Sequence, residues 1–254
     1  MALRLVALGD STVEGLMDRG PGDVYVGWAD RFAQLLARQR GDVLYANLAV
    51  RGQTTSEVLA TQVDRAVALR PDLALFVAGV NDVLRPRLHR PTLRANLLAT
   101  HRRLHEAGAS VLTFTVPDMT RVAPIAFALR PRIGYLNDVV REAGASRATT
   151  VVDLAAEPLA GHPALWHDDR LHANSEGHRR IAAALAESYG LEAEDWRDDP
   201  DEPAAAGALR ILARETSWVA GHLTPWAWGR LRGHESKTGG RCKRPDLLPV
   251  AVAG

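Results

Sequence analysis

The residues in this chain most able to do chemistry are a serine near the start and an aspartate and a histidine near residue 170. Ser11 directly follows an apolar segment, residues 3–8, which is too short for a lone helix and is bounded by Gly9. Such a segment is typical of a strand buried on both faces. Asp169 precedes His172 by three residues, a spacing that a single turn of chain can close. A hydroxyl, an imidazole and a carboxylate can together perform acyl transfer, because the imidazole deprotonates the hydroxyl and the carboxylate orients the imidazole.

Acyl transfer through a serine also needs preset donors for the oxyanion of the tetrahedral intermediate. Three candidates follow the first three apolar runs: the backbone N–H groups of Ser11 and Gly52, and the side-chain amide of Asn81. Gly52 suits this role because no side chain blocks the approach to its backbone. Serine is also a favoured N-cap residue, so Ser11 by itself is equally consistent with a simple helix cap.

The elements that must bring these residues together alternate along the chain. Strands are expected at residues 3–8, 43–50, 72–78, 110–116 and 149–153, and helices at residues 28–40, 54–70, 91–104, 133–145 and 175–189. This alternation predicts an α/β fold, a flavodoxin-like three-layer αβα sandwich with a five-stranded parallel sheet and a C-terminal helical extension. The carboxyl ends of parallel strands share one edge of the sheet, so the candidate residues are expected to meet there.

Four short blocks of the sequence together resemble a known family. The blocks are residues 9–15 (GDSTVEG), 47–52 (NLAVRG), 79–82 (GVND) and 169–172 (DRLH), the last followed by Asn174. In this order and spacing they are similar to the blocks of the SGNH (GDSL) hydrolases, over about residues 3–190. The resemblance implies that Ser11 is the nucleophile, His172 the base and Asp169 its partner, with Ser11, Gly52 and Asn81 as oxyanion donors. It also implies hydrolysis of carboxylic esters or thioesters without a metal or organic cofactor.

We therefore expect a serine esterase that hydrolyses acyl or acetyl esters or thioesters through an acyl-enzyme on Ser11. The alternatives are a non-catalytic acyl- or sugar-binding protein on the same scaffold, and an interaction protein that depends on its C-terminal tail. The expected partner is a small-molecule ester, whose acyl chain and leaving group depend on variable loops. Residues 117–131, with Met119, Ile125 and Phe127, are expected to line the pocket.

Other polar residues near these blocks are expected to be structural. Asp10 and Asp82 would brace their turns through hydrogen bonds to the backbone, and Arg51 would be solvated. Asp168 competes with Asp169 as the orienting carboxylate, and the three-residue spacing favours Asp169. A metal site is the alternative use of the histidines and aspartates in this region, but a Ser-His-Asp arrangement already uses their chemistry and His178 is expected to pack locally. The residues concerned are His162, His167, Asp168, Asp169, His172 and His178.

Composition limits the remaining possibilities. The 254 residues carry a formal net charge of +1, which gives no reason to expect a nucleic acid as partner. The single cysteine, Cys242, excludes an internal disulfide and a multi-cysteine zinc site. No signal segment and no apolar run of about 18 residues is seen, so a cytoplasmic protein is expected.

The chain changes character after residue 190. We expect a catalytic domain at residues 1–190, a solvated acidic linker at residues 191–206 and a basic, tryptophan-containing extension at residues 207–254. A helix is expected from Leu209 to about Leu231, broken or kinked at Pro225. The simplest interpretation is a helix docked on the catalytic domain. A membrane-surface anchor, which is not favoured, and a dimerisation arm are the alternatives.

Overall fold

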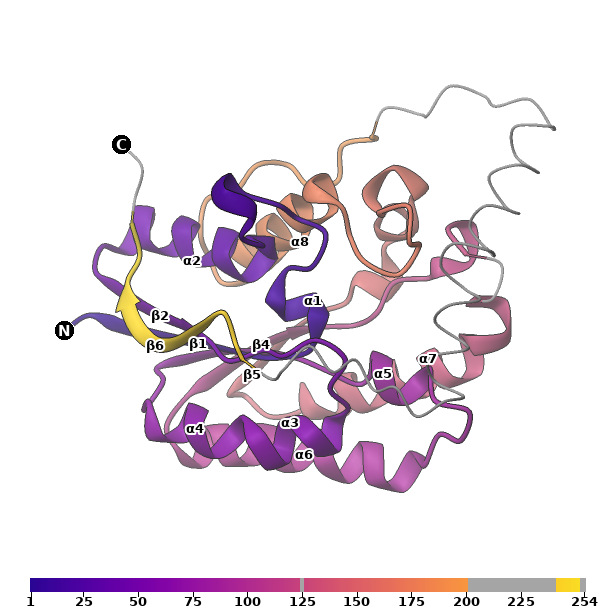
Figure 1. Ribbon diagram of the computed structural model, residues 1–254, viewed down its shortest axis with the longest axis horizontal. Coiled ribbons are helices and arrows are strands. Elements are labelled where there is room, and N and C mark those ends of the chain that lie inside the picture. The colour runs from indigo at the N-terminus through magenta and orange to yellow at the C-terminus, as the bar shows by residue number, and fades with distance from the viewer. Residues whose placement is uncertain (124–125, 201–240, 252–254) are drawn as a thin grey trace.

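The five expected strands form one sheet, and a sixth strand joins them at the edge. The computed structural model describes residues 1–123, 126–200 and 241–251. The strands are β1 (Leu3–Gly9), β2 (Val43–Asn47), β3 (Leu73–Val77), β4 (Ser110–Phe114), β5 (Thr149–Val152) and β6 (Arg244–Pro249). Their order is β5-β4-β3-β1-β2-β6, with the first five parallel and β6 antiparallel to β2. The predicted α/β sandwich around a parallel sheet is confirmed (Figure 1).

Helices cover both faces of the sheet. They are α1 (Ser11–Glu14), α2 (Gly27–Arg40), α3 (Thr55–Thr61), α4 (Val63–Ala68), α5 (Val80–Val83), α6 (Arg90–Glu106), α7 (Ala126–Ala143) and α8 (Ser175–Ser188). Short 3-10 turns lie at Pro21–Asp23, Met119–Arg121, Leu154–Ala156, Pro158–Gly161 and Pro163–Leu165. Helices α2 and α8 pack on one face, and α3, α4, α6 and α7 pack on the other (Figure 1). Among the described residues, no helix combines the length and the apolar character that crossing a bilayer requires.

Strand β1 shows why the sheet must be covered on both sides. Leu5 and Ala7 pack in the cluster with α2 and α8, whereas Val6 and Leu8 pack in the cluster on the opposite face. All four side chains are fully buried. Because successive side chains of a strand point to opposite faces, a continuous apolar run is the pattern of a central strand in a three-layer fold.

Side-chain caps begin several of the helices. Thr54 and Glu57 form the capping box that starts α3. Asn174 caps α8, because its side-chain oxygen accepts the N–H of Gly177 at 3.0 Å. Helix α7 differs from expectation, since it begins at Ala126 rather than near residue 133 and contains Pro131. Pro131 lies in the second turn, where the loss of one backbone hydrogen bond does not end the helix.

The described part of the C-terminal extension contains a strand, β6, that was not expected from the sequence. Strand β6 pairs Tyr45 with Leu248 and Asn47 with Arg244 at the edge of the sheet. Its two prolines, Pro245 and Pro249, argue against a strand in the sequence because proline lacks a backbone donor, but an edge position tolerates them. The helix expected at residues 209–231 lies outside the described residues.

Lys243, just before β6, holds this strand on the first half of the domain. Its ammonium lies 2.5 Å from the carboxylate of Asp30. It also donates to the backbone carbonyls of Glu14, Tyr25 and Val26 at 2.6, 2.9 and 2.7 Å. Glu14 ends α1, and Tyr25 and Val26 directly precede α2, so the C-terminal strand braces the chain just after the candidate serine.

The acidic segment also packs on the domain over its described part. Leu191 and Trp196 are only 6% and 5% exposed. The Trp196 carbonyl accepts from Arg180 of α8 at 3.1 Å, and its indole N–H donates to Glu187 at 2.5 Å. Leu191 and Trp196 thus anchor residues 191–200 on the domain, while the acidic side chains of this segment are exposed. Residues 201–206 lie outside the described residues, and the division of the chain at residues 190 and 206 stays a prediction.

Candidate active site

Ser11 lies at a sharp turn between β1 and α1. Gly9 has φ +148°, and a side chain there would meet the carbonyl oxygen of Val77 at 2.1 Å. The N-cap of α1 is Asp10 rather than Ser11, because an Asp10 carboxylate oxygen accepts the N–H of Thr12 at 3.0 Å. The simple capping interpretation of Ser11 is therefore wrong. The Ser11 hydroxyl is instead 2.8 Å from Nε2 of His172, although the two residues are 161 positions apart.

Asp169 lies on the other side of the His172 ring. Its Oδ2 is 2.7 Å from His172 Nδ1, and its Oδ1 accepts the backbone N–H groups of Leu171 and His172, each at 3.0 Å. Burial alone would raise the pKa of Asp169, but the hydrogen bonds and the charge of His172 outweigh it and lower the pKa to about 2. The carboxylate is therefore ionised at neutral pH and can hold the proton of the imidazole on Nδ1.

A closed turn places Asp169, and not Asp168, against the imidazole. The His167 N–H donates to the carbonyl of His172 at 2.9 Å, and the Arg170 N–H donates to the carbonyl of His167 at 2.8 Å. Arg170 takes a left-handed backbone conformation, with φ +59°. The side chain of Asp168 is exposed. The three-residue spacing thus closes as the sequence suggested.

The candidate oxyanion donors are only partly brought together. Asn81 lines the same pocket as Ser11 and His172. Its amide nitrogen lies 3.1 Å from Asp10 Oδ2 and 3.1 Å from the carbonyl of Gln53. Gly52 takes a left-handed conformation, φ +80°, in the exposed turn next to Gln53, and it does not line the pocket. The Asn81–Gln53 hydrogen bond ties the two loops to each other.

Asp10 and Asp82 brace the loops around Asn81, as expected. Asp10 is buried and accepts from Asn81, and burial raises its pKa to about 6 although Thr12 donates to it. Asp82 accepts the N–H and the hydroxyl of Thr55 at 2.9 and 2.8 Å. The two carboxylates thus connect the turn after β1, the loop before α3 and the loop after β3.

Gln62 is a buried residue that sequence reasoning missed. Its side chain accepts the N–H of Gly9 at 2.8 Å and donates to the carbonyl of Gly9 at 2.8 Å. It also donates to the side chain of Gln53 at 2.6 Å. The signal in the sequence is a polar residue four positions after Val58, on the buried side of an amphipathic segment.

The expectation of a solvated Arg51 is wrong. Its guanidinium donates to the Glu14 carboxylate, with Nε–Oε2 at 3.0 Å, and its backbone N–H contacts the same carboxylate at 3.2 Å. The guanidinium also lies over the ring of Tyr25, 5.2 Å from the centroid. This ion pair joins the end of α1 to the residue before Gly52, so it links the serine turn to the glycine turn.

An apolar pocket of about 120 Å³ opens beside the Ser11 hydroxyl and His172. Its walls include the apolar side chains of Val80, Phe114, Met119, Ile133, Leu136 and Ile181. Of the residues expected to line it, Met119 does so, whereas Phe127 is 61% exposed and is not part of the wall. Ile125 lies outside the described residues. Most of the surface that a substrate would meet beyond the hydroxyl is therefore hydrocarbon.

His178 packs locally, as expected, and it does so as a neutral ring. Its Nδ1 accepts the backbone N–H of Trp28 at 3.2 Å, and its Nε2 lies 3.1 Å from the carbonyl of Leu16. Burial lowers the pKa of His178 to about 4, although the hydrogen bond to Leu16 and the charge of Asp18 act to raise it. Protonation of Nδ1 would remove the acceptor of the Trp28 N–H.

Acid is therefore expected to remove the stability that the neutral His178 provides. An unfolded histidine titrates near pH 6.5, so between that pH and about pH 4 the unfolded chain binds one proton more than the folded chain. The contribution is complete above about pH 6.5 and is lost as pH falls towards 4. We expect the difference in unfolding free energy between the wild type and His178→Gln to shrink by up to about 3 kcal/mol over this interval.

Urea unfolding at a series of pH values measures this difference. The comparison with a variant is needed because Asp10 and Asp30, whose pKa values burial raises to about 6, act in the opposite direction in the same range. Both aspartates are present in each protein and cancel in the difference. Parallel stability curves for the two proteins would show that His178 does not titrate as described.

Two neighbouring histidines, His162 and His167, accept hydrogen bonds from backbone N–H groups of their own loops. His162 accepts the N–H of Ala164 at 3.3 Å, and His167 accepts the N–H of Asp169 at 3.2 Å. Within the described ranges, His, Cys, Asp and Glu side chains form no group of three or more that could hold a metal ion. The alternative of a metal site at these histidines has no support in that part of the chain.

Comparisons with known sequences and structures identify proteins that this chain is similar to. The sequence model of the GDSL-like lipase/acylhydrolase family matches residues 7–180. TesA is similar in structure, with a TM-score of 0.60 and 22% identity over 73% of this chain and 97% of its own. A mutant of Axe2, an acetylxylan esterase from Geobacillus stearothermophilus, has a TM-score of 0.63 and 19% identity over 77% of this chain and 97% of its own.

The psychrotrophic esterase EstA from Pseudoalteromonas sp. is also similar, with a TM-score of 0.56 and 18% identity over 74% of this chain and 96% of its own. No curated protein sequence matches this chain significantly. At these identities the structural neighbours show the fold. The match to the family model covers more than half of the chain.

Proposed function

This chain belongs to the GDSL-like lipase/acylhydrolase family, and on that premise we propose that it is a serine hydrolase of carboxylic esters or thioesters that works through an acyl-enzyme on Ser11. The observation that carries the proposal is the continuous contact from the Ser11 hydroxyl to His172 at 2.8 Å and on to Asp169 at 2.7 Å. Ser11, at one end of this series of contacts, lines an apolar pocket. A hydroxyl, an imidazole and a carboxylate in this order are the parts of a nucleophile with its base.

In the first half of the reaction, Ser11 Oγ attacks the acyl carbonyl carbon and His172 takes its proton at Nε2. The Nδ1–H of the resulting imidazolium faces the ionised Asp169, which stabilises the charge. When the tetrahedral intermediate collapses, the bond to the alcohol or thiol breaks and His172 returns the proton to that leaving group. The acyl group remains on Ser11 as an ester.

In the second half, His172 deprotonates a water molecule that attacks the acyl-enzyme, and the carboxylic acid leaves as the proton returns to Ser11. Both tetrahedral intermediates carry an oxyanion, for which we propose the N–H groups of Ser11 and Gly52 and the amide of Asn81. The two hydrogens of that amide match its two acceptors, Asp10 and Gln53. To bind the oxyanion, the Asn81 amide must therefore give up its hydrogen bond to Asp10 or to Gln53, or share one of these hydrogens with the oxyanion.

Covalent labelling with a fluorophosphonate probe tests the proposal without knowledge of the substrate. We expect the folded protein to gain one phosphonyl adduct, located by peptide mass spectrometry on Ser11, because only an activated serine attacks such a probe at neutral pH. Heat-denatured protein and the Ser11→Ala variant should remain unlabelled. A folded wild-type protein that gains no adduct would contradict the proposal and favour a non-catalytic acyl- or sugar-binding protein.

A further inference from the structure

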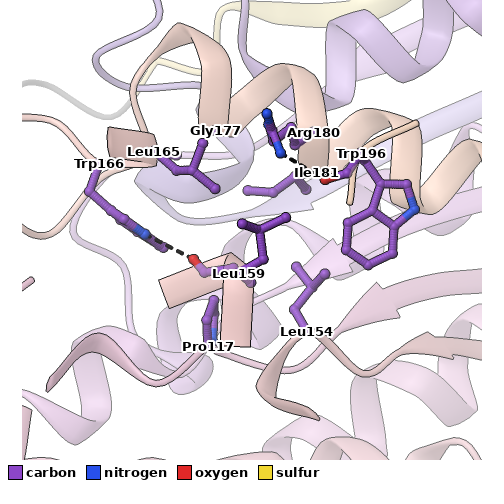
Figure 2. Close-up of a pocket in the computed structure, with 11 residues that line it drawn as sticks. Pro117, Leu154, Leu159, Leu165, Trp166, Gly177, Arg180, Ile181 and Trp196 are labelled. Atoms are coloured by element: carbon purple, nitrogen blue, oxygen red, sulfur yellow. Dashed lines mark hydrogen bonds between the residues drawn. The ribbon is translucent and has the colours of Figure 1, made fainter. Parts of the chain in front are cut away.

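A second, much smaller cavity of about 20 Å³ adjoins the pocket at Ser11. Figure 2 shows the labelled side chains around it, with Leu159 and Ile181 between Trp166 and Trp196. Its lining is almost entirely apolar, and Trp196, which closes it, belongs to the packed part of the acidic segment. A dry cavity of this kind offers no hydrogen-bond partners for water, so it suits hydrocarbon.

The cavity and the pocket at Ser11 share a wall. Pro117, Trp166, Ala173 and Ile181 line both of them. The cavity is therefore a direct neighbour of the pocket, and these four residues border both spaces.

The wall is held in place by backbone and side-chain hydrogen bonds. The indole N–H of Trp166 donates to the carbonyl of Ala160 at 3.0 Å (Figure 2), and Trp166 forms an antiparallel bridge with Ala173. Helix α8 crosses from one space to the other, because His178 lines the pocket, Gly177 lines the cavity and Ile181 lines both. Positions three and four apart share one face of a helix, so Ile181 lies directly between the two spaces.

We propose that Ile181 sets the upper limit on the length of the acyl chain that this enzyme accepts, a specificity role that rests on the proposed esterase function. Pro117 and Ala173 contribute little beyond their backbones, and Trp166 is fixed by its hydrogen bond. Ile181 is the aliphatic side chain of the wall and lies within α8, so its truncation widens the space between pocket and cavity without changing the loops. The substrate class that follows is an ester or thioester with an unbranched apolar acyl chain.

The test compares chain-length profiles of kcat/KM on p-nitrophenyl esters from acetate to palmitate. Ile181→Ala removes three carbons and joins the pocket to the cavity, so the preferred chain is expected to lengthen by about three carbons. At roughly fourfold per additional buried methylene, esters longer than the wild-type optimum should gain about 10- to 60-fold. The acetyl ester, whose acyl group has only two carbons to bury, should change less than about threefold.

Two further variants separate this effect from general loosening. Ile181→Val removes one carbon, keeps the packing of α8 and should shift the profile in the same direction by a smaller amount. Leu35→Ala truncates a partly buried leucine of α2 that lines neither space, and it should lower the melting temperature without moving the profile. A shift in Leu35→Ala equal to that of Ile181→Ala would overturn the inference.

The inference and the proposed function fail in distinguishable ways. A wild-type enzyme that hydrolyses these esters, with folded Ile181 variants whose profiles match its own, overturns the role of Ile181 and leaves the esterase intact. A folded wild type that hydrolyses no ester and takes no fluorophosphonate label overturns the proposed function, and the inference with it.

Discussion

Replacement of Ser11 by alanine is expected to lower kcat on a short p-nitrophenyl ester by roughly 10⁴- to 10⁶-fold while the protein stays folded. The reason is that no other hydroxyl is held at 2.8 Å from His172 among the described contacts. Ser11 is partly exposed and is not the cap of α1, so its loss removes no capping hydrogen bond. Steady-state kinetics and the thermal unfolding curve of the same preparation measure the two effects.

The matched control is Ser188→Ala at the exposed end of α8. The Ser188 hydroxyl donates only to the carbonyl of Leu185, so activity should stay within about twofold of wild type. If Ser11→Ala retained wild-type turnover, the nucleophile would have to be another group. If it were unfolded, the comparison would move to the adduct site found by fluorophosphonate labelling of the wild type.

The second large loss of kcat is expected when either member of the His172–Asp169 pair is replaced. The loss should be larger for His172 than for Asp169. His172→Gln removes the base and should lower kcat by roughly 10⁴- to 10⁶-fold. Asp169→Asn keeps the size of the side chain but replaces an acceptor by an amide, which can hold the ring in the wrong tautomer. The loss of kcat in Asp169→Asn should be smaller, roughly 10³- to 10⁴-fold, because the carboxylate orients and stabilises the ring without touching the substrate.

Asp168→Asn is the matched control for this pair. Asp168 is exposed and adjacent in sequence, so the same chemical change there should leave kcat within about threefold of wild type. A larger loss from Asp168→Asn than from Asp169→Asn would transfer the orienting role to Asp168. The carboxylate of Asp169 should stay ionised throughout the assay range, since its pKa lies at about 2.

The fold was largely predictable because its signals are local. Short, predominantly apolar segments marked the five parallel strands, and the segments between them marked most of the helices. The errors occurred where a local rule was overridden by tertiary packing. The edge strand β6 was not predicted because it contains Pro245 and Pro249. The burial of Trp196 against α8 was not predicted because its neighbours in sequence are acidic.

The reactive residues of the candidate site were predictable from the sequence, whereas the hydrogen bonds that hold the surrounding loops were not. Residue types, order and the family blocks singled out Ser11, Asp169 and His172, and the structure brings their side chains into contact. The roles of Gly52 and Asn81 stay predictions. The contacts of Gln62 with Gly9 and of Arg51 with Glu14 were missed, because each joins segments that are distant in sequence and that carry no shared pattern.

The sequence by itself determined the family, the α/β class and the type of chemistry, because strand periodicity and reactive residue types are properties of short segments. Only the tertiary structure decided which carboxylate faces the imidazole and how the C-terminal strand is anchored. It also decided that Ile181 borders both the apolar pocket at Ser11 and a small neighbouring cavity. These features depend on distances between side chains from different loops, and such distances exist only once the sheet has brought its carboxyl edge together.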